Sequence, residues 1–452
     1  MTDNNSQATD DVAQGRVERR QLLKYAGAAS AVGLTGLAGC SGNGGGGGEG
    51  TDTGGSGPDT LVVIGYPEDG IQLFRDFYSV AGSDQPVLVP DGLQDGDLPN
   101  QVGNPMENVM GTAPAAGGPN QEAFTSLFED EYGESPGVFT SQSYDSVAVQ
   151  ILANAAAGEN TGESVRDQMR RVANPPGMEV GMDNFVEGVE AAANGDDVNF
   201  QGASSAVNFD QNGDPASAAY QLWEFSDDGV STIRSESFQG ANPEGSGPSA
   251  DSGPGGLGRT ARVGILLPET GSLASVGGPM IQAAQLPAMQ VNESDIDFSV
   301  ETQVEDTETN SQSGVSAANT LVNAGFPSVC GSASSGVNVP VSQEVFIPNE
   351  VVGCSPSSTA LSVTNLEDDD YIFRTAPSDR LQGRVMAQVA SETQDASTAA
   401  TLYVNNDYGQ QLSERFTEVF EETFDGTVQN QVAFNQGESS YSSVVNTALS
   451  GE

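Results

Sequence analysis

Two stretches made mostly of glycine, serine, proline and acidic residues divide this chain and limit what it can fold into. They cover residues 40–57 and 241–258, and sequences of this kind cannot pack and behave as flexible connections. The hydrophobic residues are concentrated in two blocks, 58–240 and 259–452. We expect both blocks to fold, joined by the second flexible stretch.

Both blocks alternate short apolar runs with stretches of helical periodicity. Residues 60–65 and 261–267 are apolar runs typical of buried strands, whereas 144–157 and 411–424 place apolar residues at helical spacing. Alternation of strands and helices favours parallel, doubly wound sheets. The sequence therefore predicts an α/β fold, which binds ligands at the carboxyl ends of its strands.

The charge of the chain excludes several classes of function. It has 63 acidic residues, 15 basic residues and no histidine, which gives a net charge of −48. Such a surface repels nucleic acid. Without histidine there is no Ser-His or Cys-His pair, no His-based metal site and no imidazole acid–base catalyst. Because molar salt shortens electrostatic screening to about 3 Å, this composition is typical of a halophilic protein that folds in multimolar salt.

Residues 1–39 have the features of an export signal. Arg19 and Arg20 precede an apolar stretch that is too short and too rich in glycine for a mature transmembrane helix. Leucine, alanine and glycine then precede Cys40, which is typical of a lipobox. We expect twin-arginine export, a diacylglyceryl thioether on Cys40 and a tether at 40–57, which would place the protein on the outer face of the cytoplasmic membrane. The alternative is a buried apolar helix with an incidental cysteine.

The start of the second block resembles the branched-chain amino acid/amide-type substrate-binding proteins of ABC transporters. The first matching stretch is 263–274, with the sequence VGILLPETGSLA. Later stretches that fall where the family has similar ones are 331–336 (GSASSG), 355–359 (SPSST), 373–375 (FRT) and 407–409 (DYG). The resemblance implies the type I periplasmic-binding-protein fold of the Leu/Ile/Val-binding proteins, in which two α/β lobes close around a small ligand.

The first block resembles the later half of the same family, so that the two halves stand in swapped order. Its matching stretches are 61–66 (LVVIGY), 89–92 (VPDG), 143–145 (SYD), 200–203 (FQGA) and 209–214 (FDQNGD). The tetrapeptide GSGP occurs at 55–58 and again at 245–248, and exchanging 58–247 with 248–452 restores the family order. We interpret this as a circular permutation, or as a gene rearrangement or assembly error that mimics one. If the chain folds, each lobe must be built from both blocks.

The resemblance implies a ligand site at the strand ends of both lobes. Ser334 and Ser335 precede a predicted helix at 337–345, whose regular part is limited by Pro340. Hydroxyls with free amides at the start of a helix suit a carboxylate. The family match adds Ser358 and Thr359 as hydroxyl and backbone contacts to the ligand. An ordinary serine N-cap is the alternative for the first pair.

Three further residues are expected at the same site. Asp91 matches an acidic position that pairs with the ligand ammonium, and Tyr66 and Tyr408 match an aromatic wall and a phenol hydrogen bond. A turn aspartate and core tyrosines are the alternatives. Val276 stands where amino-acid binders often carry an aromatic residue, so the resemblance leaves the ligand open between a branched-chain or other amino acid, an amide and another small carboxylate.

Cys330 and Cys354 are predicted near the ends of two neighbouring strands. An exported protein permits a disulfide, but adjacent parallel strands rarely give good disulfide geometry. The sequence leaves open whether the two residues form a disulfide or remain buried thiols.

The expected function is binding rather than catalysis, with no catalytic residue, metal or cofactor predicted. The resemblance implies a lipid-anchored receptor that delivers an amino acid or amide to an ABC permease and its ATPase by hinge closure. The alternatives are an extracellular sensing module without transport and a non-functional rearranged gene product. An enzyme is disfavoured because the sequence shows no nucleophile–base pair.

Overall fold

A computed structural model of the chain describes residues 57–227, 229–239 and 256–451. These residues belong to one compact unit. The predicted signal peptide, Cys40 and most of the two flexible stretches lie outside the described residues. In the part that is described, no helix is both long enough and apolar enough to cross a membrane.

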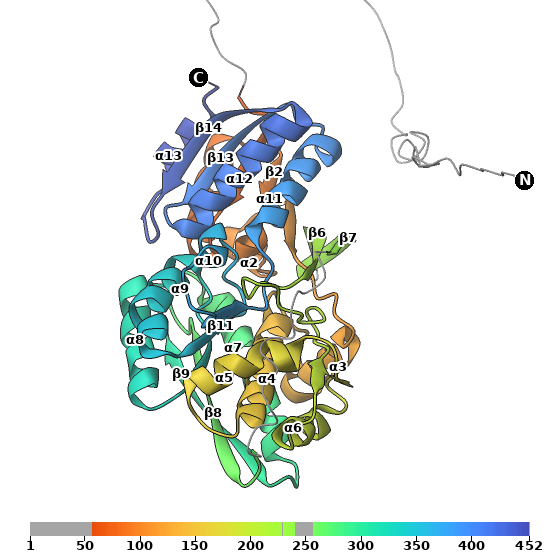
Figure 1. The fold of residues 1–452 in the computed structure, drawn as a ribbon. Helices are drawn as coiled ribbons and strands as arrows, with labels where there is room; N and C mark the ends of the chain where they lie inside the picture. Colours follow the sequence, from red (N-terminus) through yellow and green to blue (C-terminus); the bar gives the residue numbers. More distant parts are fainter. Residues whose placement is uncertain (1–56, 228, 240–255, 452) are drawn as a thin grey trace, which may run out of the picture. The chain divides into compact units, whose positions relative to one another are not determined.

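One lobe is built on a seven-stranded sheet that contains strands from both blocks (Figure 1). Its order is β14-β13-β1-β2-β3-β6-β7. The strands are β1 (Thr60–Ile64), β2 (Val87–Val89), β3 (Val109–Pro114), β6 (Ser217–Ser226), β7 (Gly229–Gln239), β13 (Thr398–Val404) and β14 (Thr427–Phe434). β1 runs parallel to β13, with Thr60 opposite Ala399 and Ile64 opposite Tyr403. This pairing joins the two blocks into one sheet.

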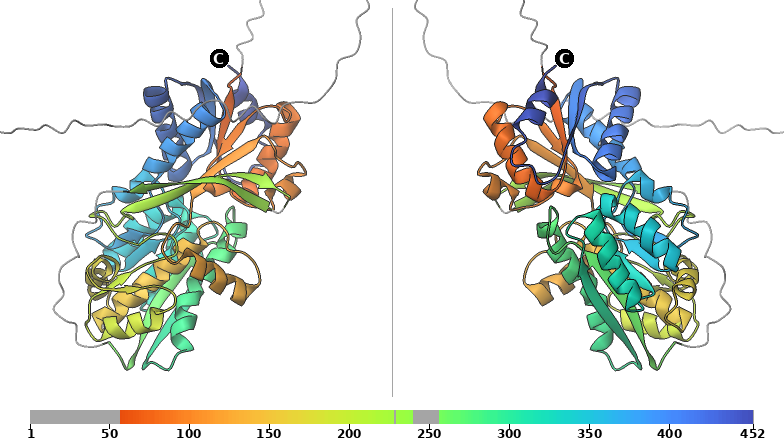
Figure 2. Two further views of the ribbon diagram at one scale, coloured as in Figure 1. Left: turned by 90° about the vertical axis from the view of Figure 1, so that its right-hand side faces the viewer. Right: turned by 90° about the vertical axis from the view of Figure 1, so that its left-hand side faces the viewer.

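Helices cover both faces of the seven-stranded sheet. They are α1 (Pro67–Val80), α2 (Leu98–Val102), α11 (Asp379–Gln388), α12 (Asp407–Phe424) and α13 (Ser442–Leu449). α1 packs on α13 and α11 packs on α12, and Figure 2 shows the two pairs on opposite faces. α12 begins at Asp407 because the Asn406 side chain accepts a hydrogen bond from Gly409 N at 3.0 Å. Its buried face includes Leu412, Phe416 and Phe420, as the helical spacing predicts.

The other lobe is built on a five-stranded sheet with the order β12-β11-β10-β8-β9. All its strand pairs are parallel. The strands are β8 (Arg259–Leu267), β9 (Phe298–Asp306), β10 (Ser328–Gly331), β11 (Val352–Ser355) and β12 (Ile372–Arg374). All five come from the second block, so the first block contributes to this lobe through its helices.

The helix α4 (Thr140–Ala157) carries the main contribution of the first block to the five-stranded lobe. It is buried along all 18 residues and packs on α7 (Ala274–Asn292) and on β8, β10 and β11. The remaining helices are α3 (Gln121–Tyr132), α5 (Gly162–Ala173), α6 (Phe185–Ala193), α8 (Ser311–Asn323), α9 (Ser335–Val341) and α10 (Leu361–Thr364). The small sheet has β4 (Met178–Val180) and β5 (Val198–Phe200). The short 3₁₀-helices are η1 (Asp91–Leu93) and η3 (Ile347–Asn349), and the short π-helices are η2 (Ser342–Phe346) and η4 (Val389–Thr393).

Both sheets share one strand order when the chain is read from the second block into the first. In the five-stranded lobe, the order of β8 to β12 is second, first, third, fourth, fifth. In the seven-stranded lobe, the series β13, β14, β1, β2, β3 has the same order. This is the order of a doubly wound sheet, whose ligand site lies between the first and third strands. The predicted α/β fold with two parallel-sheet lobes, each drawn from both blocks, is therefore confirmed.

A buried ion pair fixes the two blocks to one another near the connection between the lobes. Arg374, which is fully buried, binds Asp214 through two hydrogen bonds of 2.6 and 2.8 Å. Its other N–H groups donate to the carbonyls of Ser358 and Ala360 and to the hydroxyl of Thr364. Arg374 thus uses all five of its donors, which compensates the cost of burying its charge.

The two cysteines of the folded part lie opposite one another on β10 and β11. Cys330 and Cys354 are register partners, and both are buried and free. Burial raises the pKa of Cys330 to about 12 and raises the pKa of Cys354 as well. Of the two readings left open by the sequence, the structure has buried thiols.

Candidate functional site

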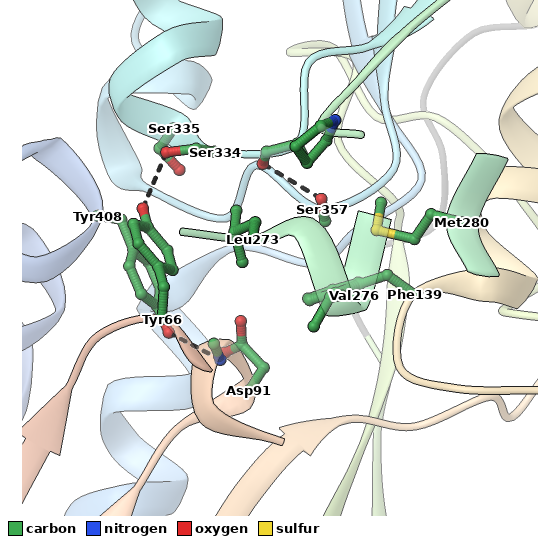
Figure 3. Close-up of a pocket in the computed structure, with 13 residues that line it drawn as sticks. Tyr66, Asp91, Phe139, Leu273, Val276, Met280, Ser334, Ser335, Ser357 and Tyr408 are labelled. Carbon is green, nitrogen blue, oxygen red and sulfur yellow. Dashed lines mark hydrogen bonds between the residues drawn. The ribbon is translucent and has the colours of Figure 1, made fainter. Parts of the chain in front are cut away.

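The carboxyl ends of strands from both lobes face one pocket (Figure 3). From the seven-stranded lobe, Tyr66 follows β1, Asp91 and Gly92 follow β2, and Tyr408 lies at the start of α12. From the other lobe come residues that follow β8, β10 and β11, together with two from α7 and one that precedes α4. These are Pro268, Leu273, Val276, Met280, Ala333, Ser334, Ser335, Ser357 and Phe139. The pocket therefore lies where doubly wound sheets bind ligands.

Hydroxyl groups form the wall of the pocket at the start of α9. Ser334 precedes this helix but makes no side-chain cap hydrogen bond, so its hydroxyl does not act as an ordinary N-cap. The Ser335 hydroxyl accepts hydrogen bonds from Ala360 N and from the Ser358 hydroxyl, both at 3.2 Å. These contacts hold the Ser335 side chain in place beside the first-turn amides of α9, an arrangement that suits an anionic group.

Two stacked tyrosines form the wall on the seven-stranded lobe. The rings of Tyr66 and Tyr408 have centroids 5.8 Å apart and planes 12° apart. The Tyr66 hydroxyl lies 2.8 Å from the Ser334 hydroxyl and accepts a hydrogen bond from Asn406 Nδ2 at 3.0 Å. Burial raises the pKa of Tyr66 to about 12. Both rings are therefore neutral, and the Tyr66 hydroxyl bridges the two lobes.

Asp91 is the acidic residue of the pocket and is only 3% exposed. It begins η1, and its carboxylate accepts a hydrogen bond from the Gln382 side chain. The next amide, Gly92 N, donates to the Tyr408 hydroxyl at 3.2 Å. Burial raises the pKa of Asp91 to about 6, although the hydrogen bonds from Gln382 and Tyr408 oppose this shift. The site thus holds a carboxylate with no cationic side chain among the residues that line it.

Apolar side chains close the remaining side of the pocket. They are Phe139, Pro268, Leu273, Val276 and Met280. The sequence drew attention only to Val276, because apolar residues that line a pocket have the same pattern as residues of a core. Phe139 has φ of 61°, in the left-handed region, which is uncommon for a bulky residue, but the structure shows this and the sequence does not.

Five of the seven predicted ligand residues line the pocket, namely Tyr66, Asp91, Ser334, Ser335 and Tyr408. Ser358 and Thr359 lie in the adjoining loop and are fully buried behind Ser335. The Thr359 hydroxyl has no hydrogen-bond partner within the described residues. These two residues support the wall in this conformation and do not form its surface.

The pocket is nearly closed in this conformation. Its volume is ≈ 30 Å³, which is enough for a water molecule and too small for an amino acid. Ligand entry therefore requires the lobes to separate. No group of three or more acidic or cysteine side chains within the described residues could hold a metal ion.

Part of the chain is similar in sequence to proteins of known type. It is 30% identical over 158 residues to Leu/Ile/Val-binding protein homolog 3 of Brucella melitensis biotype 1, a match that covers 34% of this chain and 42% of that protein. It is 29% identical over 156 residues to Leu/Ile/Val-binding protein BraC3 of Rhizobium johnstonii, with the same coverage of 34% and 42%. The aligned part thus spans less than half the length of these two relatives.

Solved structures of similar proteins also match part of the chain. The leucine-binding protein LivK of Thermotoga maritima has 22% identity and a TM-score of 0.39, and the match covers 42% of this chain and 53% of that one. The branched-chain amino acid transporter substrate-binding protein LivJ of Streptococcus pneumoniae, solved with isoleucine, has 24% identity and a TM-score of 0.37, with the same coverage of 42% and 53%. The model of a whole family matches much more of the sequence, at residues 53–217 and 260–451, and by this match the chain belongs to the periplasmic binding protein family.

Proposed function

We propose that this protein captures an amino acid with an apolar side chain between its two lobes and delivers it to an ABC permease. The observation that carries the proposal is the composition of the pocket. The pocket combines hydroxyls and amides at the start of α9, the buried carboxylate of Asp91 and a wall of apolar side chains. The names of the partial relatives, which are Leu/Ile/Val-binding proteins, support the same ligand class.

Each part of a zwitterionic amino acid has a matching group in the pocket. A carboxylate would accept hydrogen bonds from Ser334, Ser335 and the first-turn amides of α9. An ammonium would pair with Asp91, since burial raises the pKa of this carboxyl to about 6 and a cation beside it would favour the charged form. An aliphatic side chain would pack on Leu273 and Met280, which are buried at 7% and 1% exposure. Ser358 and Thr359 would contribute through Ser335 or become exposed when the cleft opens.

Hinge closure is the proposed mechanism. The lobes must part for a ligand to enter, and the Tyr66–Ser334 hydrogen bond holds them together in the unliganded conformation. A ligand that touches both lobes binds the closed form better than the open form and shifts the population towards closure. A permease that recognises only the form closed around a ligand, and not the closed empty form, would then receive only loaded protein.

We also propose that the chain is a circular permutation of the family order. The common strand order of the two sheets supports this, because it appears only when the second block is read first. A variant that places 248–452 before 58–247 should fold and bind the same ligand with similar affinity. Sequencing across both junctions in the source genome distinguishes a natural permutation from an assembly error.

Export and anchoring complete the proposal. The twin-arginine motif and Cys40 are the supporting observations, and a diacylglyceryl group on Cys40 would hold the folded part at the outer face of the cytoplasmic membrane. Cys40→Ala should release the protein from membranes into the medium. Retention of this variant on membranes would contradict the anchor.

Calorimetric titration of the full chain in multimolar NaCl tests the ligand. We expect saturable binding of leucine, isoleucine or valine, and weaker binding of the corresponding hydroxy acids, which lack the ammonium. Uptake into vesicles that contain the permease and its ATPase tests delivery. Absence of binding for every amino acid and amide would overturn the proposed function.

A further inference from the structure

Basic residues are scarce in this protein, and most of them have a partner. Four of the 15 basic residues precede residue 57, which leaves 11 arginines in the described part. Six of these form ion pairs, and Arg75 and Arg259 donate to carbonyl or amide oxygens. Within the described residues, the side chains of Arg234, Arg380 and Arg384 have no hydrogen bond or ion pair.

Two of these three arginines stand together. Arg380 and Arg384 are one turn apart on α11 and both are exposed. Arg415 of α12 lies beside them, since its Nε donates to Arg380 O at 3.3 Å. Like charges at this spacing on a helix repel one another. Because the chain has 63 carboxylates, randomly placed arginines would be expected to lie beside acidic residues. Here three arginines are adjacent and two of them have no acidic partner.

The three arginines are among the residues that line a groove with a volume of ≈ 840 Å³. Asp210 and Asp214 also line the groove, but Asp214 is paired with a buried arginine and one oxygen of Asp210 is bonded to backbone amides. Asp214 binds Arg374 and Thr364, and Asp210 Oδ1 accepts hydrogen bonds from the amides of Asn212 and Asp214. Arg415 pairs with the exposed Glu418. The groove therefore presents guanidinium donors that no carboxylate of the described chain takes up.

We propose that this groove binds an oxyanion with two or more negative charges, such as phosphate or a small polycarboxylate. Planar guanidinium groups match such oxyanions through paired N–H···O bonds. Salt screens distant, exposed charges strongly but screens partly buried pairs in direct contact much less, so such a site can act where long-range attraction is lost. The proposal is independent of the amino-acid site, because the groove and that site have no lining residue in common.

Calorimetric titration with inorganic phosphate and, separately, with citrate tests the proposal. The full chain is used in multimolar NaCl, with the total ionic strength held constant. We expect saturable binding of at least one anion to the unmodified protein. The double variant Arg380→Gln/Arg384→Gln should bind this anion with an affinity at least about tenfold lower. Near-ultraviolet circular dichroism checks that this variant is folded.

The matched control is Arg234→Gln, which removes an arginine on β7 that also lacks a partner but does not line the groove. This variant should bind the anion as the unmodified protein does. If neither anion gives saturable heat with the unmodified protein, the proposal is wrong. It is also wrong if all three proteins bind the anion equally, because the heat then comes from a general effect of the salt. Binding of phosphate alone or of citrate alone identifies which source of oxyanion the groove accepts.

Discussion

The hydroxyl oxygens of Tyr66 and Ser334 lie 2.8 Å apart and join the carboxyl end of β1 to that of β10. The two residues belong to different blocks of the chain and to different lobes. Because their hydrogen bond can form only when the two lobes are close together, its presence indicates a closed cleft. In the proposed mode of binding, a ligand carboxylate would bond to the Ser334 hydroxyl, so that ligand binding would compete with this contact.

Tyr66→Phe should shift the unliganded protein towards an open cleft. The variant keeps the stacked ring but loses the hydrogen bond between the lobes, which is worth about 1 kcal/mol. Small-angle X-ray scattering without ligand should show a larger radius of gyration than for the unmodified protein. Tyr78→Phe is the matched control, because Tyr78 bonds to Asn108 at 2.8 Å within one lobe. Equal radii for both variants would show that this bond does not hold the cleft closed.

Asp91→Asn should weaken amino-acid binding by about 2–4 kcal/mol, since it leaves a buried ammonium without its counter-charge. The loss is measured by calorimetric titration with leucine and with its hydroxy-acid analogue. The analogue lacks the ammonium, so the substitution should change its affinity far less. Asp97→Asn, at an exposed position of the same lobe, should bind leucine normally. Equal losses for leucine and the analogue would mean that Asp91 does not pair with the ammonium.

Val276→Ala tests the apolar wall. Removing two methyl groups from a side chain that is 9% exposed should cost branched-chain ligands about 1–2 kcal/mol of binding free energy. Glycine and alanine have little or no side chain to contact this wall, so their affinity should change little. Competition titrations give the ratio of leucine to alanine affinity, which should fall. An unchanged ratio would place the ligand side chain elsewhere.

The strands and helices of this fold could be predicted from the sequence because each produces a characteristic local pattern of apolar residues. The apolar run at 261–267 lies within β8, and the periodic stretch at 411–424 lies within α12. The helix predicted at 337–345 begins earlier, at Ser335, and is α-helical only to Val341 before it continues as the wider turn η2. Pro340 lacks an amide hydrogen, and the sequence indicates for this reason that the regular part of the helix is short, as α9 is.

The site was harder to predict than the fold. Residues that match a family motif, such as Asp91 and Tyr408, were found through the resemblance, and the structure places them in one pocket. Phe139 and Met280 were not found, because an apolar side chain facing a pocket has the same sequence pattern as one facing a core. The Tyr66–Ser334 contact was not predictable, since it depends on how far the lobes have closed.

Arg374→Met should destabilise the fold by about 3–5 kcal/mol, because it leaves the carboxylate of Asp214 buried without its partner. The free energy of unfolding is measured by urea titration in multimolar NaCl. The double variant Arg374→Met/Asp214→Leu removes both charges and should recover part of the loss. If the double variant is no more stable than the sum of the single losses predicts, the pair does not act as a unit.

Ligand affinity should rise as pH increases through about 6, the value to which burial raises the pKa of Asp91. Below this pH the unliganded site is protonated, and binding an ammonium must first displace the proton. The affinity should therefore fall by about tenfold per pH unit below the pKa, down to the lower pKa of the liganded state. Calorimetric titrations in buffers of different ionisation heat should show a proton released on binding in this range. Asp91→Asn has no proton to lose, so its residual affinity should not vary across the same range. A matching slope in the variant would assign the pH dependence to another group.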